Sequence, residues 1–167
     1  MGVAQTRASF EEYVRARTPA LTRIAYLVAG NQHDAEDLVQ VALERAAVRW
    51  RQLEDPEAYL RRVIYTQAVS RWRRLRARPP ETLTDRPPER PSETDHDTRL
   101  VLADAIARLT PRQRAVLVLR FYEDRTEAES AALLGVSTGT VKSQTRHALR
   151  RLRELAPELA DLAGVRA

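Results

Sequence analysis

The 167-residue chain contains no cysteine and only five glycines, and aromatic residues make up 5% of it. Without cysteine there are no disulfides, thiolate metal ligands or thiol nucleophile, which suits a reducing cytoplasm. No P-loop, GxSxG or GxGxxG motif occurs. The three histidines, His33, His96 and His147, are far apart and lack zinc-ligand spacing. We therefore expect no enzyme activity, no metal and no cofactor.

Long apolar runs are also absent, so the sequence predicts neither a signal peptide nor a membrane span, and we expect a cytoplasmic protein. Hydrophobic residues still make up 43% of the chain, which is enough for packed cores. Apolar positions recur at helical spacing and no alternating strand pattern is found. The expected fold is all-α, with two small helical domains joined by a flexible Pro-rich linker, the C-terminal domain being a helix-turn-helix.

Positive charge is in excess, with a formal net charge of +5 and a pI near 10.2, which favours a polyanionic partner. The charge is unevenly distributed. Residues 1–78 carry 14 basic and 9 acidic groups, residues 79–97 carry 2 and 6, and residues 98–167 carry 12 and 8. This distribution predicts two basic domains, 1–78 and 98–167, with an acidic linker between them.

The segment 79–97 holds five of the nine prolines and almost no apolar residue, which indicates a linker. As a random coil it would span about 25 Å, and as an extended polyproline-like chain about 60 Å. The two basic domains could therefore contact DNA more than one turn apart, a turn being about 34 Å.

In the N-terminal half, Ser9 and Glu12 have the spacing of a capping box, Pro19 marks a kink or a restart, and Gly30 ends the segment. A second helix is expected from about residue 33 to 50. Acidic residues cluster in its first turn. Stabilisation of the helix N-terminus explains such a cluster as well as a binding role does.

Asp55 and Pro56 predict the start of a third helix, running to about residue 76. It is the most basic segment of the chain, and Tyr65 and Trp72 lie among its arginines. Aromatic rings can stack on unpaired bases while guanidinium groups follow the phosphates. A packing role is the competing interpretation for Trp72.

The stretch 126–155 predicts a helix-turn-helix. Thr126 and Glu129 are spaced as a capping box, Gly135 suits the left-handed residue that ends the first helix, and Ser137 is placed to cap the second. Upstream, Thr110 and Gln113 form a further capping box.

With Val141 pointing inward, the second helix of this motif has an outward arc that contains no acidic residue. The arc consists of Thr140, Ser143, Arg146, His147 and Arg150, flanked by Lys142 and Arg151. Short hydrogen-bonding groups followed by cations suit contacts to base edges and phosphates. A solvated basic helix face is the alternative.

Taken together, three segments resemble a known family: DAEDLVQVALERA (34–46), AYLRRVIYTQAVSRWRR (58–74) and LTPRQRAVLVLRFYEDRTEAESAALLGVSTGTVKSQTRHALRRLR (109–153). They are similar to the extracytoplasmic-function sigma factors of bacterial RNA polymerase, and most similar to the actinobacterial SigE family. The resemblance implies a sigma factor that binds core RNA polymerase and directs promoter-specific initiation.

The resemblance also implies roles for individual residues. The surface that docks on the clamp helices of the largest polymerase subunit would contain Asp34, Glu36, Asp37, Leu38 and Gln40. The minus-ten element, with its melted non-template strand, would be contacted by Arg61, Arg62, Tyr65, Thr66, Ser70, Trp72, Arg73 and Arg74. The double-stranded minus-thirty-five element would be contacted by Thr140, Lys142, Ser143, Gln144, Arg146, His147 and Arg150. An anti-sigma factor is a further candidate partner, and no membrane contact is expected.

Two other functions stay open from the sequence. A stand-alone helix-turn-helix regulator would bind an operator as a dimer without polymerase, and it would leave the acidic helix and the linker unexplained. Alternatively, the N-terminal half is purely a protein-interaction module. The basic and aromatic third helix argues against that possibility.

Overall fold

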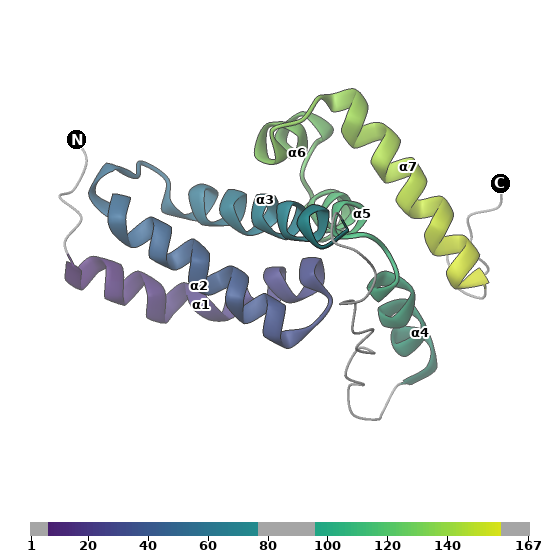
Figure 1. Ribbon diagram of the computed structural model, residues 1–167, viewed down its shortest axis with the longest axis horizontal. Helices are drawn as coiled ribbons and strands as arrows, with labels where there is room; N and C mark the ends of the chain where they lie inside the picture. Colours follow the sequence, from purple (N-terminus) through teal and green to yellow (C-terminus); the bar gives the residue numbers. More distant parts are fainter. Residues whose placement is uncertain (1–6, 77–95, 158–167) are drawn as a thin grey trace.

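The computed structural model describes residues 7–76 and 96–157, and every regular element in these ranges is helical (Figure 1). The all-α prediction is confirmed. The elements are α1 (Arg7–Ala29), α2 (Gln32–Arg49), η1 (Trp50–Gln52), α3 (Pro56–Arg76), α4 (His96–Ala107), α5 (Pro111–Leu117), η3 (Val118–Tyr122), α6 (Glu127–Leu134) and α7 (Thr138–Leu155). The predicted linker lies outside the described residues except at its end, where α4 already begins at His96.

The first two helices form an antiparallel pair. Helix α1 continues through Pro19 without restarting, and it already includes Arg7, so Ser9 cannot cap it as predicted. Ser9 instead accepts a hydrogen bond from the Trp50 indole nitrogen at 3.1 Å. At the turn, Gly30 adopts a left-handed φ of 87°, and the Asn31 side chain caps α2.

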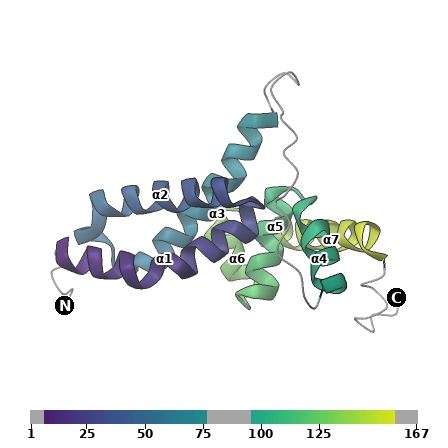
Figure 2. The same ribbon diagram turned by 90° about the horizontal axis from the view of Figure 1, so that it is seen from below.

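Helix α3 begins where the sequence predicts, with the Asp55 carboxylate accepting from the backbone N–H of Ala58 at 3.0 Å. It packs on α1 and α2 along most of its length. Its C-terminal end extends beyond α2 (Figure 2). Arg73 and Arg74 near this end are exposed and accessible to a large ligand.

The predicted caps of the C-terminal half are confirmed. Thr110 with Gln113 and Thr126 with Glu129 form reciprocal capping boxes, and Ser137 caps α7. Gly135 ends α6 with a φ of 66°. No local pattern predicted the π-helical segment η3, which inserts a wider turn between α5 and α6.

One hydrophobic core joins the two halves of the chain. Ala115, Val118 and Leu119 from α5 and η3 are buried in the same cluster as the apolar faces of α1, α2 and α3. Leu133 and Leu134 of α6 pack against it. The C-terminal half therefore lies directly on the N-terminal helices (Figure 1).

Candidate nucleic-acid and protein interfaces

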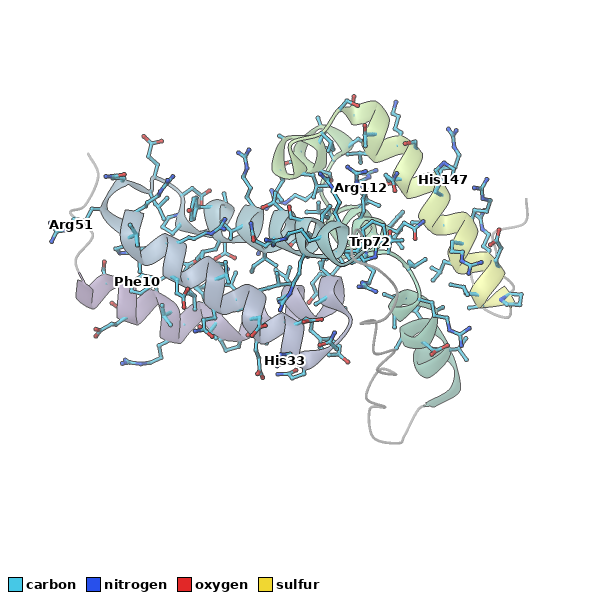
Figure 3. The ribbon with its side chains drawn as sticks, viewed as in Figure 1. Phe10, His33, Arg51, Trp72, Arg112 and His147 are labelled. Carbon is cyan, nitrogen blue, oxygen red and sulfur yellow. The ribbon has the colours of Figure 1, made fainter. Side chains whose placement is uncertain are left out.

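Helix α7 presents the predicted basic arc to solvent. Val141 and Ala148 are fully buried, which fixes the rotation of the helix. Lys142, Arg146, His147 and Arg150 are exposed, and Thr140, Ser143 and Gln144 are half-buried. His147 lies on the side of α7 that points away from α1 and α2 (Figure 3). The arc is therefore open to a polyanion.

Few intramolecular contacts hold these side chains. Arg150 donates to the His147 ring nitrogen Nδ1 at 2.7 Å, and Ser143 Oγ donates to the Thr140 carbonyl at 3.0 Å. Lys142 lies 3.6 Å from the Glu127 carboxylate of α6, an exposed and therefore weak ion pair. Binding a phosphate backbone would cost little in lost internal contacts.

The acidic cluster of α2 is partly neutralised by α3. Arg71 donates to Asp37 at 2.8 Å and lies 3.6 Å from Asp34. The Arg71 hydrogen bond outweighs the effect of burial and holds the pKa of Asp37 below its usual value, with a smaller contribution from the charge of His33. These acids thus tie α2 to α3 besides stabilising the helix N-terminus.

The predicted docking residues do not all lie on the surface. Glu36 and Gln40 are exposed, whereas Leu38 is only 3% exposed. Leu38 lines a groove of about 240 Å³ between α2 and α3, together with Asp37, Gln40 and Arg74. A partner helix could touch its polar rim, while Leu38 mainly supports the groove from within.

Helix α3 presents only part of its predicted DNA-contacting set. Arg62, Arg73 and Arg74 are exposed, and Thr66, Ser70 and Trp72 are half-buried. Tyr65 is fully buried, so its ring is unavailable for base stacking in this arrangement. Arg61 is ion-paired with Glu57 of its own helix and with Glu123 beyond η3.

The start of α3 is held by an ion cluster that the sequence did not reveal. Glu57 accepts hydrogen bonds from Tyr13 at 2.6 Å, Arg17 at 2.7 and 2.9 Å, and Arg61 at 3.0 Å. Burial raises the pKa of Glu57, but these donors outweigh burial and lower the pKa to about 2. The four-residue spacing of Glu57 and Arg61 was the one local indication of this cluster. Tyr13 and Arg17 of α1 reach Glu57 only through tertiary packing.

Some of the predicted minus-ten and minus-thirty-five residues line a common groove. This groove of about 270 Å³ lies between α3 and the C-terminal helices. From α3 it is lined by Thr66, Ser70 and Arg73, and from α7 by Thr140 and Gln144. Two surfaces predicted to bind separate DNA elements are thus brought together.

Within the described part of the chain, no group of three or more His, Asp or Glu side chains is placed to hold a metal ion. His33 and His147 lie at separate places in the structure (Figure 3). No described helix is long and apolar enough to span a membrane.

Comparison with known proteins matches both halves of the chain. The model of Sigma-70 region 2 matches residues 13–78, and the model of Sigma-70, region 4 matches residues 105–154. The chain is 45% identical to the RNA polymerase sigma-E factor of Streptomyces coelicolor, over 87% of this chain and 84% of the relative. It is 31% identical to the ECF RNA polymerase sigma factor SigM of Mycobacterium tuberculosis, over 92% and 80%.

Among solved structures, the fold is similar to the sigma factor RpoE of Bartonella quintana, crystallised in complex with the anti-sigma factor NepR. The TM-score is 0.65 at 24% identity, covering 89% of this chain and 96% of that one.

Proposed function

The chain belongs to the extracytoplasmic-function sigma factors of the sigma-70 family, and we propose which of its parts bind RNA polymerase and which bind the promoter to direct transcription initiation. Residues 1–78 act as region 2, residues 79–97 as the linker and residues 98–167 as region 4. The two family matches, at 13–78 and 105–154, support this division. Sigma factors are not enzymes, and this one works in the cytoplasm with polymerase and DNA.

The minus-thirty-five element binds α7. The observation that carries this assignment is the exposed, acid-free arc from Thr140 to Arg150, positioned by buried Val141 and the left-handed turn at Gly135. The hydroxyls of Thr140 and Ser143 lie near the helix N-terminus, which enters the major groove in helix-turn-helix proteins. Arg146 and His147 follow on the same face and reach bases or phosphates.

The minus-ten element binds α3. Exposed Arg62, Arg73 and Arg74 supply phosphate contacts, and half-buried Thr66 and Ser70 are the hydroxyls available to a melted strand. The projecting end of α3 leaves room for that strand (Figure 2).

The clamp helices of the largest polymerase subunit dock on α2. Exposed Glu36 and Gln40 and the half-exposed Asp37 form a polar edge along the groove between α2 and α3. The stand-alone regulator function offers no role for this edge. An anti-sigma factor that covers the same edge would compete with polymerase.

Replacing one acid of this edge tests the docking surface. Asp37→Arg reverses the charge of the edge and removes the ion pair with Arg71, so we expect binding of core polymerase to fall below detection in a fluorescence-anisotropy titration. Asp104→Arg is the matched control, since Asp104 is an exposed helical acid whose ion-pair partner among the described residues is Arg108 of its own helix. Both variants should keep the helical circular dichroism of the parent. Unchanged binding by Asp37→Arg would remove α2 from the polymerase interface.

A further inference from the structure

One side chain of the α7 arc is held by another. Arg150 Nη2 lies 2.7 Å from the Nδ1 of His147, which precedes it by three residues on the same exposed face. The guanidinium of an arginine stays protonated in proteins, and all its polar groups are donors. Arg150 is therefore the donor of this bond, and Nδ1 of His147 must be the acceptor.

This hydrogen bond determines where the His147 ring carries its proton. A ring nitrogen that accepts a hydrogen bond has no proton, and a neutral imidazole has a single N–H. The proton of His147 is therefore on Nε2. A doubly protonated ring could not accept at Nδ1, so the bond also holds the ring in its neutral form. Within the described residues Nε2 has no hydrogen-bond partner, which leaves its N–H free for a ligand.

The charges around His147 differ from those around the other described histidine. The Nε2 of His33 lies 3.9 Å from the Asp37 carboxylate, a partner that stabilises a charged imidazole. No ion pair of the described residues includes His147, and its hydrogen-bond partner is the cation Arg150. A cation at this place opposes a second positive charge on the ring. His147 is thus a neutral donor within an otherwise cationic arc.

His147 is also aligned with the two hydroxyls of the arc. It follows Ser143 by four residues and Thr140 by seven, so the three side chains form one row along α7. His147 points away from α1 and α2, where DNA has access (Figure 3). Cations such as Arg146 suit phosphates, whereas directional donors and acceptors distinguish base edges. The row from Thr140 to His147 is therefore suited to bases.

A single N–H distinguishes bases by their acceptors. In the major groove guanine presents N7 and O6, adenine presents N7 and thymine presents O4, whereas the polar group of cytosine there is a donor, its amino group. An N–H that faces this amino group would leave two donors unpaired. Cytosine is therefore the base that the Nε2–H of His147 should reject.

We propose that His147 recognises one base of the minus-thirty-five element through its Nε2–H, and that Arg150 is the positioning residue that holds the imidazole in this tautomer and orientation. The inference rests on the proposed binding of that element by α7. It gives the two residues different roles. His147 selects the base, while the remaining N–H groups of Arg150 stay available for a phosphate.

The tautomer is measured on the full chain by long-range ¹H–¹⁵N correlation NMR with ¹⁵N-labelled histidine. His147→Ala identifies the signals of this ring among those of the three histidines. We expect the Nε2–H form to exceed about 90% of the neutral ring in the parent. Arg150→Ala should increase the Nδ1–H form, and Arg150→Lys, which keeps a cationic donor, should largely prevent the increase. Equal tautomer populations in the parent and Arg150→Ala would overturn the positioning role.

Base recognition is measured by selecting duplexes from a randomised DNA pool with the protein bound to core polymerase, and sequencing them. The parent should deplete cytosine about five- to tenfold at one position of the upstream element. His147→Ala should abolish this depletion and keep the preferences at other positions. The amide of His147→Gln places an N–H about where Nε2–H lies and pairs well with adenine, so it should restore a preference at the same position. The shorter His147→Asn should not.

Two further variants separate the position of Arg150 from its charge. Arg150→Ala should weaken the cytosine depletion at the position that His147 recognises, and Arg150→Lys should restore most of it. Arg153→Ala is the matched control, because it removes the same charge from an exposed position of α7 that lies six residues from His147. It should leave the depletion unchanged. All these variants change exposed side chains and should keep the helical circular dichroism of the parent.

The possible failures can be told apart. Unchanged cytosine depletion in His147→Ala would overturn base recognition by this residue while leaving α7 on the minus-thirty-five element. Equal weakening of binding to every sequence would make His147 a phosphate contact and would overturn the inference as well. A parent pool with no preferred base at any upstream position would contradict the proposed function itself, and the inference with it.

Discussion

Helices α3 and α7 are both basic and amphipathic, and both are proposed to bind promoter DNA, yet their functional faces differ in exposure and in ion pairing. The cations in and beside the α7 arc are exposed, and among the described residues only Lys142 and Arg151 of them have acidic partners. On α3, Tyr65 is buried and Arg61 is paired with two glutamates. A pattern of basic and aromatic residues therefore indicates DNA binding only when tertiary packing leaves the face open.

The largest effect that separates the two helices is expected at Tyr65. Tyr65→Ala removes a fully buried ring from the shared core, which should lower the free energy of unfolding by about 3–5 kcal/mol. Urea denaturation followed by circular dichroism measures it. The neighbouring half-buried Thr66→Ala should cost less than about 1 kcal/mol. Similar losses for both variants would mean that Tyr65 is not a core residue.

On α7 the corresponding substitution should change binding and leave stability unaffected. Arg146→Ala should weaken binding of the polymerase complex to its promoter by about 1–3 kcal/mol and relax specificity at one upstream base pair. Arg23→Ala is the control, because Arg23 is an exposed arginine of α1 and lies outside the arc. An equal loss on every sequence would make Arg146 a phosphate contact.

The starts of α3 and α7 should differ in how their contributions to stability change with acid. Glu57 is held ionised down to a pKa of about 2 from its ordinary 4.5. Its contribution is therefore complete above pH 4.5 and is lost as the pH falls toward 2. The shift corresponds to roughly 3 kcal/mol, reduced to about 1–2 kcal/mol because a quarter of the side chain is exposed to solvent.

Denaturation at a series of pH values, compared between the parent and Glu57→Gln, isolates this contribution. The difference in unfolding free energy between the two proteins should shrink as the pH falls from 4.5 toward 2. A difference that is constant with pH would show that the charge of Glu57 does not stabilise α3.

The smallest effect is expected at the start of α7, where a neutral hydroxyl performs the capping. Ser137 accepts from the backbone N–H of Thr140 at 3.1 Å. Ser137→Ala should cost about 1 kcal/mol, with no dependence on pH between 2 and 5, roughly the range over which carboxylates titrate. Hydrogen exchange at the first turn of α7 would locate the change. Protection equal to that of the parent would mean that the cap contributes nothing.

The same contrast explains which features the sequence could predict. Thr126, Gly135 and Ser137 act within a few residues of themselves, so the helix-turn-helix and its outward arc follow from local spacing. Ser9 was assigned as a cap from the same kind of spacing, and its actual partner is Trp50, far along the chain. Local spacing predicted where helices begin and end more reliably than it predicted which side chains form hydrogen bonds with one another.

The functional surface of α3 depends on contacts between distant segments. Nothing near Arg114 indicates that it caps α1, and nothing near Glu123 indicates that it pairs with Arg61. Leu38 fits the family motif but supports the groove from within. Family resemblance assigns roles by motif position, whereas exposure depends on how the two halves pack.

Run-off transcription tests the central claim most directly. Purified core polymerase is incubated with sheared genomic DNA from the source organism, with and without the protein. Discrete transcripts that appear only with the protein, and whose start sites share two upstream elements, are the predicted result. No transcripts, together with tight binding of DNA by the protein alone, would contradict a role as a sigma factor.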